Sequence, residues 1–96
     1  MVIMILKYVT ALKEIDKHLA AHREFLDVNF QQKKFICSGR QNPRVGGIIL
    51  ANVDNIDEAK KISQADPFSI NDVAEYSFIE FVPGKYDDRF ACFANH

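Results

Sequence analysis

The sequence predicts an α+β domain in which a four-stranded antiparallel sheet carries two helices on one face. The first observation is the order of the segments, because four stretches rich in β-branched and aromatic residues alternate with two stretches of helical periodicity as β-α-β-β-α-β. The second is size, because 96 residues of which 48% are hydrophobic suffice for one modest core. The third is that apolar residues occupy both faces of the last strand, so two helices on one face leave the other uncovered.

The first two predicted elements are a strand over residues 1–9 and one long helix over residues 11–32. His22 is the one polar residue at the centre of the apolar arc of this helix, whereas His18 lies to one side, where we expect solvent. The arc consists of four residues at helical spacing: Ile15, Leu19, His22 and Leu26.

The middle of the chain predicts a hairpin, with strands over residues 34–39 and 45–53 joined by a polar turn over residues 40–44. A Gly-Gly pair at 46–47 indicates a bulge or a close backbone approach near the start of the second of these strands. Cys37 lies inside an apolar run, so we expect a small core residue there.

The second half of the chain predicts a helix over residues 56–65, a strand over residues 73–82 and a tail over residues 85–96. Asp54 and Asn55 are suited to cap this helix, whose apolar residues repeat at helical spacing up to Ala65. No repeat, linker or low-complexity segment divides the chain, so we expect a single domain over 1–96, with a core of about 2–85 and a tail over 86–96.

The order β-α-β-β-α-β is the ferredoxin-like arrangement. A sheet with two helices on one face and apolar side chains on the other needs further cover, and the sequence contains eight phenylalanines but no third helix to provide it. A second copy of the chain is the natural cover. We therefore expect a homodimer, or a higher oligomer built from it, in which two sheets pack face to face as a dimeric α+β barrel.

Composition excludes several classes of function. Twelve Lys and Arg against thirteen Asp and Glu give a net charge of −1, which provides no basic excess for binding nucleic acid. No apolar span reaches the length of a membrane helix, and residues 1–8 are too short for a signal sequence with a cleavage site. Two cysteines make no disulfide framework, so we expect a cytoplasmic protein with reduced thiols.

Asp66 stands where the second helix must stop, because Pro67 drives the residue before it out of the helical region. One interpretation is a turn in which the carboxylate accepts a backbone N–H two residues on. The other is a partly dehydrated carboxylate that needs a partner. His22 is the candidate partner, because a histidine paired with a carboxylate could take part in catalysis. Residue spacing alone leaves both interpretations open.

A set of short motifs runs through the chain: Ala21-His22-Arg23 with Phe25-Leu26, Ser38-Gly39, Pro43-Arg44 with Gly46-Gly47, Ala65-Asp66-Pro67-Phe68, and Glu75-Tyr76 with Glu80-Phe81. With these motifs, residues 2–85 resemble the YciI-like protein family of small ferredoxin-like proteins that pair into dimeric α+β barrels. The resemblance implies a catalytic dyad of His22 and Asp66, a pocket close to Ser38, and elimination or isomerisation of cyclic acids. Arg40 departs from the family pattern, which commonly has proline there, and thus adds a cation or changes the loop.

A histidine held by a carboxylate is a general base whose tautomer the carboxylate fixes. Ser38 is the one nearby hydroxyl, by analogy, so proton transfer is favoured over acyl-enzyme chemistry. Arg40 and Arg44 are either a bidentate site for an anionic group or two solvated loop arginines. His18 and His22 have the i, i+4 spacing of a helical metal pair, but no Cys cluster or Glu-x-x-His context supports it, and we expect no metal and no cofactor.

The sequence is compatible with three functions. The first is an enzyme that uses His22 and Asp66 for proton transfer, in an elimination, isomerisation or hydrolysis, on a small anionic organic compound. The second is a protein that binds such a ligand without turnover, and the third is a dimerisation module in which the His–Asp pair is structural. A cavity beside His22 distinguishes the first two from the third, and turnover distinguishes the first from the second.

Overall fold

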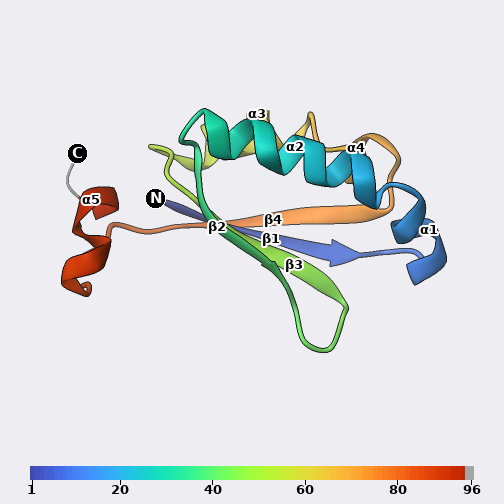
Figure 1. Cartoon of the computed structure of the whole chain (residues 1–96), viewed down its shortest axis with the longest axis horizontal. Coiled ribbons are helices and arrows are strands. Elements are labelled where there is room, and N and C mark those ends of the chain that lie inside the picture. The colour runs from blue at the N-terminus through green and yellow to red at the C-terminus, as the bar shows by residue number, and fades with distance from the viewer. Residues whose placement is uncertain (95–96) are drawn as a thin grey trace.

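The four strands form one antiparallel sheet in the order β2-β3-β1-β4 (Figure 1). We describe residues 1–94 of the chain from a computed structural model. The strands are β1 (Val2–Tyr8), β2 (Phe35–Arg40), β3 (Gly46–Ala51) and β4 (Ala74–Glu80). The predicted ferredoxin-like βαββαβ topology is therefore confirmed.

Three helices cover one face of this sheet: α2 (Leu19–Gln31), α3 (Ile56–Ser63) and the single turn α4 (Pro67–Ile70) (Figure 1). The short helix α1 (Leu12–Lys17) lies beyond the end of β1. The prediction of one continuous helix over residues 11–32 was wrong, because His18 has φ −108° and ψ 4°, which lies outside the α-helical range. The chain changes direction there, and α2 begins at Leu19.

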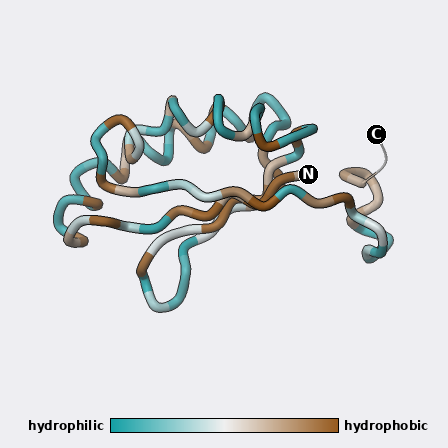
Figure 2. The backbone as a smooth tube through the Cα atoms, turned by 180° about the vertical axis from the view of Figure 1, so that it is seen from behind, coloured by the Kyte–Doolittle hydropathy of each residue, from teal (hydrophilic) through white to brown (hydrophobic). Residues whose placement is uncertain are grey.

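The core lies between the helices and the inner face of the sheet. Alternate residues of β1 (Val2, Met4 and Leu6) are buried, as period-two alternation requires. They pack with apolar side chains from the helices and from the two neighbouring strands. In Figure 2 the hydrophobic stretches run through the strands, while the helices are largely hydrophilic on their outer turns.

The outer face of the sheet, which has no helices, is also apolar. Register pairs Ile5 with Ile48 and Ile3 with both Leu50 and Ile79, which places all five on this face. Ile48 and Ile79 are exposed. Within the described chain no helix covers this surface, as the sequence pattern predicted.

Cys37 also faces this open surface, so its prediction as a core residue was wrong. The register of β2 against β3 shifts between Phe35 and Cys37, because Ile36 forms a bulge. Phe35 therefore points into the core while Cys37 lies opposite Leu50 on the outer face.

The start of α3 confirms the predicted cap. Asn55 Oδ1 accepts the N–H of Glu58 at 2.9 Å, and the Glu58 carboxylate in turn accepts the N–H of Asp54 at 3.2 Å. The helix ends at Ser63, two residues before the predicted end, so Ala65 is exposed rather than part of the buried stripe.

After β4 the chain leaves the sheet and forms a separate helical tail, the 3₁₀ turn η1 (Asp88–Phe90) followed by α5 (Ala91–Ala94) (Figures 1 and 2). The rings of Phe90 and Phe93 contact each other there. The last two residues of the predicted tail lie outside the described residues. None of the helices described is long and apolar enough to cross a membrane.

The close approach predicted at the Gly-Gly pair occurs at Gly46, which faces Lys7 of β1. A Cβ atom there would lie 1.9 Å from the backbone oxygen of Leu6, whereas a Cβ at Gly39 would meet nothing within 4 Å. We therefore expect Gly46→Ala to lower the free energy of unfolding by about 3 kcal/mol or more, because two backbones must separate.

Urea unfolding followed by circular dichroism measures this loss, with Gly39→Ala as the matched control. Gly39→Ala should change stability by less than about 0.5 kcal/mol, because it adds a methyl group to an open position of a strand. Equal stability of the two variants would contradict the close approach.

Candidate functional site

The site is built around the Asp66 carboxylate, which is completely buried. Asp66 has extended backbone angles (φ −70°, ψ 124°) between the end of α3 and Pro67, the first residue of α4. Its Oδ1 accepts the N–H of Phe68 at 2.9 Å and so caps α4. The predicted turn, with a bond to the N–H two residues on, is therefore present.

The predicted His22 contact is present as well, because one carboxylate can accept several donors. His22 Nδ1 lies 2.9 Å from Asp66 Oδ1, and the Tyr76 hydroxyl donates to Oδ2 at 2.5 Å. Three donors from α2, α4 and β4 thus converge on one buried carboxylate and compensate its lost hydration.

The network fixes the tautomer of the imidazole. An ionised carboxylate has no proton to donate, so Nδ1 of His22 must be the donor in this pair. In the neutral ring, Nε2 is then the atom with a free lone pair. A proton acceptor held in one tautomer is the arrangement that general-base chemistry requires.

Phe68 holds the plane of the imidazole. Its ring stacks on His22 with the ring centroids 4.0 Å apart and an angle of 5° between the planes, and Phe25 lies further off at 6.1 Å. Phe68 is itself buried and in edge contact with Tyr8. The His22 side chain keeps 12% of its surface exposed, so only a small part of the imidazole is accessible.

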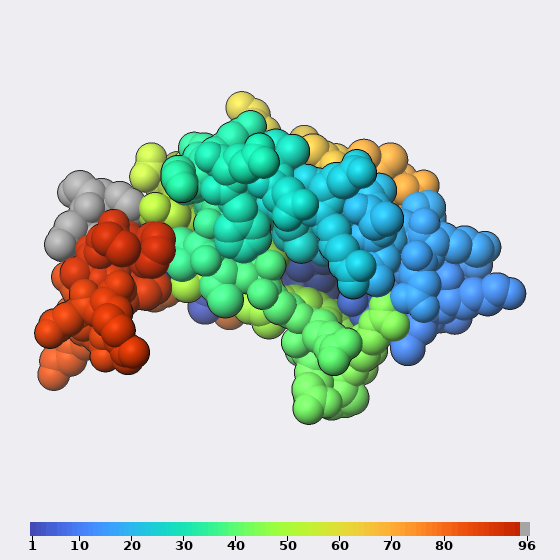
Figure 3. All heavy atoms as spheres, viewed as in Figure 1, coloured from blue at the N-terminus to red at the C-terminus, as the bar shows by residue number. Residues whose placement is uncertain are grey.

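The accessible part of His22 lines a cavity of about 360 Å³. Figure 3 shows the hollow between α2 and the β2–β3 hairpin, with β1 at its floor. Asp66 lies behind the imidazole and does not line the cavity. The aliphatic and phenylalanine residues of the wall come from β1, α2, β3 and α4: Leu6, Leu19, Leu26, Ile48, Ile49 and Phe68.

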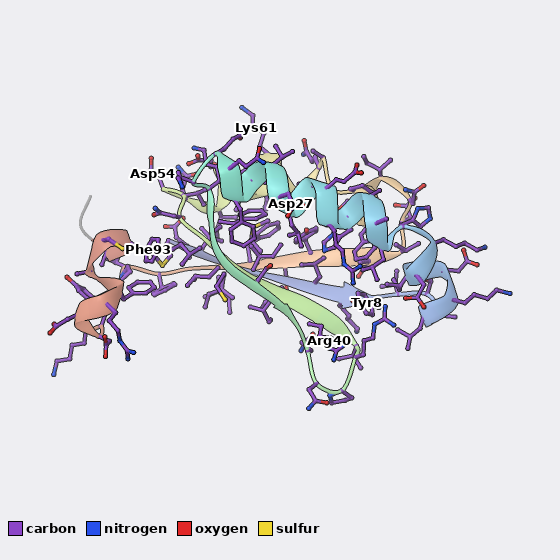
Figure 4. The ribbon with its side chains drawn as sticks, viewed as in Figure 1. Tyr8, Asp27, Arg40, Asp54, Lys61 and Phe93 are labelled. Atoms are coloured by element: carbon purple, nitrogen blue, oxygen red, sulfur yellow. The ribbon has the colours of Figure 1, made fainter. Side chains whose placement is uncertain are left out.

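The three side chains predicted to contact a ligand, Ser38, Arg40 and Arg44, all line this cavity together with His22. Ser38 lies opposite Ile49 in the register and Arg40 lies opposite Gly47, so both come from β2. Figure 4 shows Arg40 at the base of the β2–β3 hairpin and Tyr8 near the end of β1, at the same end of the sheet. The structure thus brings all five predicted site residues together in one region.

Arg44 forms an ion pair with Asp16, with Nη2 and Oδ1 2.5 Å apart. The pair joins α1 to the loop between β2 and β3 at the cavity. Arg23 also lines the cavity, and neither Arg23 nor Arg40 makes an ion pair or a side-chain hydrogen bond within the described part of the chain.

Four residues of this site were not predicted from the sequence: Tyr8, Asp16, Arg23 and Tyr76. Period-two alternation in the sequence places Tyr76 and Phe78 on one face of the last strand, but it does not show that this face is the one toward Asp66. Burial, followed by the charge of Asp66 and the hydrogen bond to it, raises the pKa of Tyr76 far above its usual value. Its hydroxyl is therefore a permanent donor to Asp66 at physiological pH.

His18, the other member of the i, i+4 pair, lies at the junction of α1 and α2, where its backbone carbonyl accepts the N–H of His22. Among residues 1–94, no group of three or more His, Cys, Asp or Glu side chains gathers as a metal site would require.

Comparison with known proteins is consistent with the resemblance in sequence. The model of the YCII-related domain family matches residues 1–82. The uncharacterised protein YjpA of Bacillus subtilis (strain 168) is 31% identical over 65 residues, which cover 68% of this chain and 76% of YjpA. A solved structure of 5-chloro-2-hydroxyhydroquinone dehydrochlorinase (TftG) from Burkholderia phenoliruptrix AC1100, in complex with 2,5-dihydroxybenzoquinone, has the same fold. It aligns with a TM-score of 0.72 and 18% identity over 92% of this chain and 100% of that one.

Removal of the Tyr76 hydroxyl tests the carboxylate network. We expect Tyr76→Phe to lower the free energy of unfolding by about 2 kcal/mol at neutral pH, because a buried carboxylate oxygen loses its donor. Since the pKa of Tyr76 is higher in the folded protein than when unfolded, the hydroxyl stabilises the fold fully below about pH 10 and loses this effect at higher pH.

The difference in stability between wild type and Tyr76→Phe should therefore shrink by up to about 1.4 kcal/mol per pH unit above pH 10. Urea unfolding of both proteins from neutral to alkaline pH measures it, and the other titrating groups cancel in the comparison. A difference that stays constant through this range would contradict the assignment.

Proposed function

The chain belongs to the YCII-related domain family, and we propose that it is an enzyme that transfers a proton to and from a small anionic organic compound. The observation that carries this proposal is the buried Asp66 carboxylate, which fixes the tautomer of a histidine whose exposed part lines a cavity. The TftG dehydrochlorinase has the same fold and binds a dihydroxybenzoquinone, which supports a small ring compound as the ligand.

In the proposed reaction, Nε2 of His22 accepts a proton from a C–H or O–H bond of the substrate. The electron pair of the broken bond stays on the substrate and forms a double bond as a leaving group departs, or takes a proton back at another atom. The first course is an elimination and the second an isomerisation, while deprotonation of a water molecule would give hydrolysis. Asp66 remains ionised and stabilises the imidazolium that forms.

Arg40, Arg44 and Ser38 are the proposed ligand contacts. A guanidinium binds a carboxylate or an ionised hydroxyl with two parallel hydrogen bonds and so orients a planar ligand in the cavity. Ser38, which lies in β2 with Arg40, adds a neutral hydroxyl that can both donate and accept a hydrogen bond. The cavity volume of about 360 Å³ is at the small end of ligand pockets, which suits a compound with a single ring.

We also propose that the working form is a homodimer through the outer face of the sheet. The isoleucines on this face have no cover from the rest of the described chain, and contiguous exposed apolar surface on a sheet marks an interaction site. A second copy offers the same surface, so the two sheets would pack face to face across a two-fold axis.

The proton transfer is tested by hydrogen–deuterium exchange at carbon. We expect the protein in D₂O to catalyse loss of the ¹H NMR signal of an acidic C–H in at least one member of a panel of hydroxylated quinones, hydroquinones and cyclic acids. His22→Asn should slow this exchange about 10²–10⁴-fold, because it removes the base.

The matched control is His18→Asn, which changes the other histidine of the same helical region outside the cavity and should leave the exchange rate unchanged. A panel member that binds wild type but exchanges no faster than in buffer would indicate a ligand-binding protein. Equal exchange with wild type and His22→Asn would contradict His22 as the base.

The dimer is tested by light scattering at micromolar concentration, where we expect twice the mass of one chain. Ile79→Glu should produce a monomer, because it buries a charge in an interface that should cover about 2,000 Å². Ile70→Glu is the matched control, since Ile70 is an exposed isoleucine at the end of α4, away from the sheet. A monomeric wild-type protein would overturn the proposal.

A further inference from the structure

The charges on the cavity wall do not cancel. Arg23 comes from α2, Arg40 from the end of β2 and Arg44 from the hairpin loop, so three guanidiniums surround one space. Only two carboxylates oppose them, Asp16 on the wall and Asp66 behind His22. With a neutral imidazole, the site carries one positive charge in excess.

The pairing of these groups shows where the excess lies. Asp66 already accepts three hydrogen bonds, and Asp16 forms an ion pair with Arg44. Arg23 and Arg40 have no such partner among the described residues. Both line the cavity, Arg23 from α2 and Arg40 from β2, two elements that contact each other. Figure 3 shows the hollow between α2 and the β2–β3 hairpin.

We infer that the substrate enters this cavity as a monoanion, with its acidic group bound by Arg23 and Arg40. The inference rests on the proposed function and deepens it, because it names the charge state of the substrate and assigns a role to Arg23. One negative charge neutralises the empty site. When His22 takes a proton, the imidazolium adds one positive charge and the substrate gains one negative charge, so the site stays neutral throughout the step.

The remainder of the wall restricts the body of this anion. Leu19, Leu26 and Phe68 provide an apolar surface beside the imidazole, which suits a hydrocarbon ring rather than a sugar or a phosphate ester. The substrate class is therefore a single-ring acid with one ionised carboxyl or hydroxyl group.

The test uses three probes that share one ring and differ in charge: benzamide, benzoate and phthalate. Binding is followed by ¹H–¹⁵N NMR through the glycine amides, because Gly39 and Gly47 line the cavity whereas Gly84 lies beyond β4 and serves as an internal reference. We expect benzoate to shift Gly39 and Gly47, and to bind at least about tenfold more tightly than benzamide, because a charge-assisted hydrogen bond is lost in the amide.

Two variants change the charge of the wall in opposite directions. Arg23→Gln should weaken benzoate about fivefold or more and leave benzamide unchanged. Asp16→Asn should raise the affinity for phthalate relative to benzoate by about fivefold, because the site then carries two positive charges in excess. The controls Arg89→Gln in the tail and Asp27→Asn on α2, which do not line the cavity, should alter neither ratio (Figure 4).

The inference is overturned if benzoate and benzamide bind equally, if Asp16→Asn leaves the phthalate-to-benzoate ratio unchanged, or if no probe shifts Gly39 and Gly47. Its failure is distinct from that of the proposed function. Catalysed deuterium exchange without charge selectivity would contradict only the monoanion. Charge-selective binding without exchange would support the monoanion and contradict the enzyme.

Discussion

The Asp66 carboxylate is the group on which the rest of the structure depends. It is fully buried, and an ionised group removed from water is stable only when its acceptors are filled. The donors come from three elements: the imidazole of His22 on α2, the N–H of Phe68 on α4 and the hydroxyl of Tyr76 on β4. One charge therefore determines how two helices and an edge strand meet.

Asp66 has a structural role and a role at the candidate site at the same time. The bond to Phe68 caps a helix of one turn, which has little stability of its own. Because the ring of Phe68 stacks on His22, the position of α4 also sets the orientation of the imidazole. Because the same carboxylate fixes the tautomer, the packing of α4 and the chemistry available at Nε2 have a common cause.

The cavity depends on the sheet register. Arg40, Gly47, Leu6 and Tyr76 are consecutive partners across β2, β3, β1 and β4, so they form one row over the inner face. Gly47 has no side chain to fill the space between Arg40 and Leu6, and this leaves room beside α2. The row runs from a free guanidinium at one edge of the sheet to the donor of Asp66 at the other.

The sequence by itself determined the fold, because the apolar periodicities of strands and helices are local and their order allows few topologies. It also indicated the His22–Asp66 pairing, which residue spacing left open beside a simple turn and which the motifs shared with a family imply. It did not determine the break at His18 or the outward direction of Cys37, because a bend and a bulge change direction without a strong signal in composition. Tyr76, Arg23 and Asp16 joined the site only in the tertiary structure. The contact of Tyr76 depends on which face of β4 turns toward α4, and the contact of Asp16 depends on the approach of α1 to the β2–β3 loop. Both are decided by packing between segments far apart in the chain.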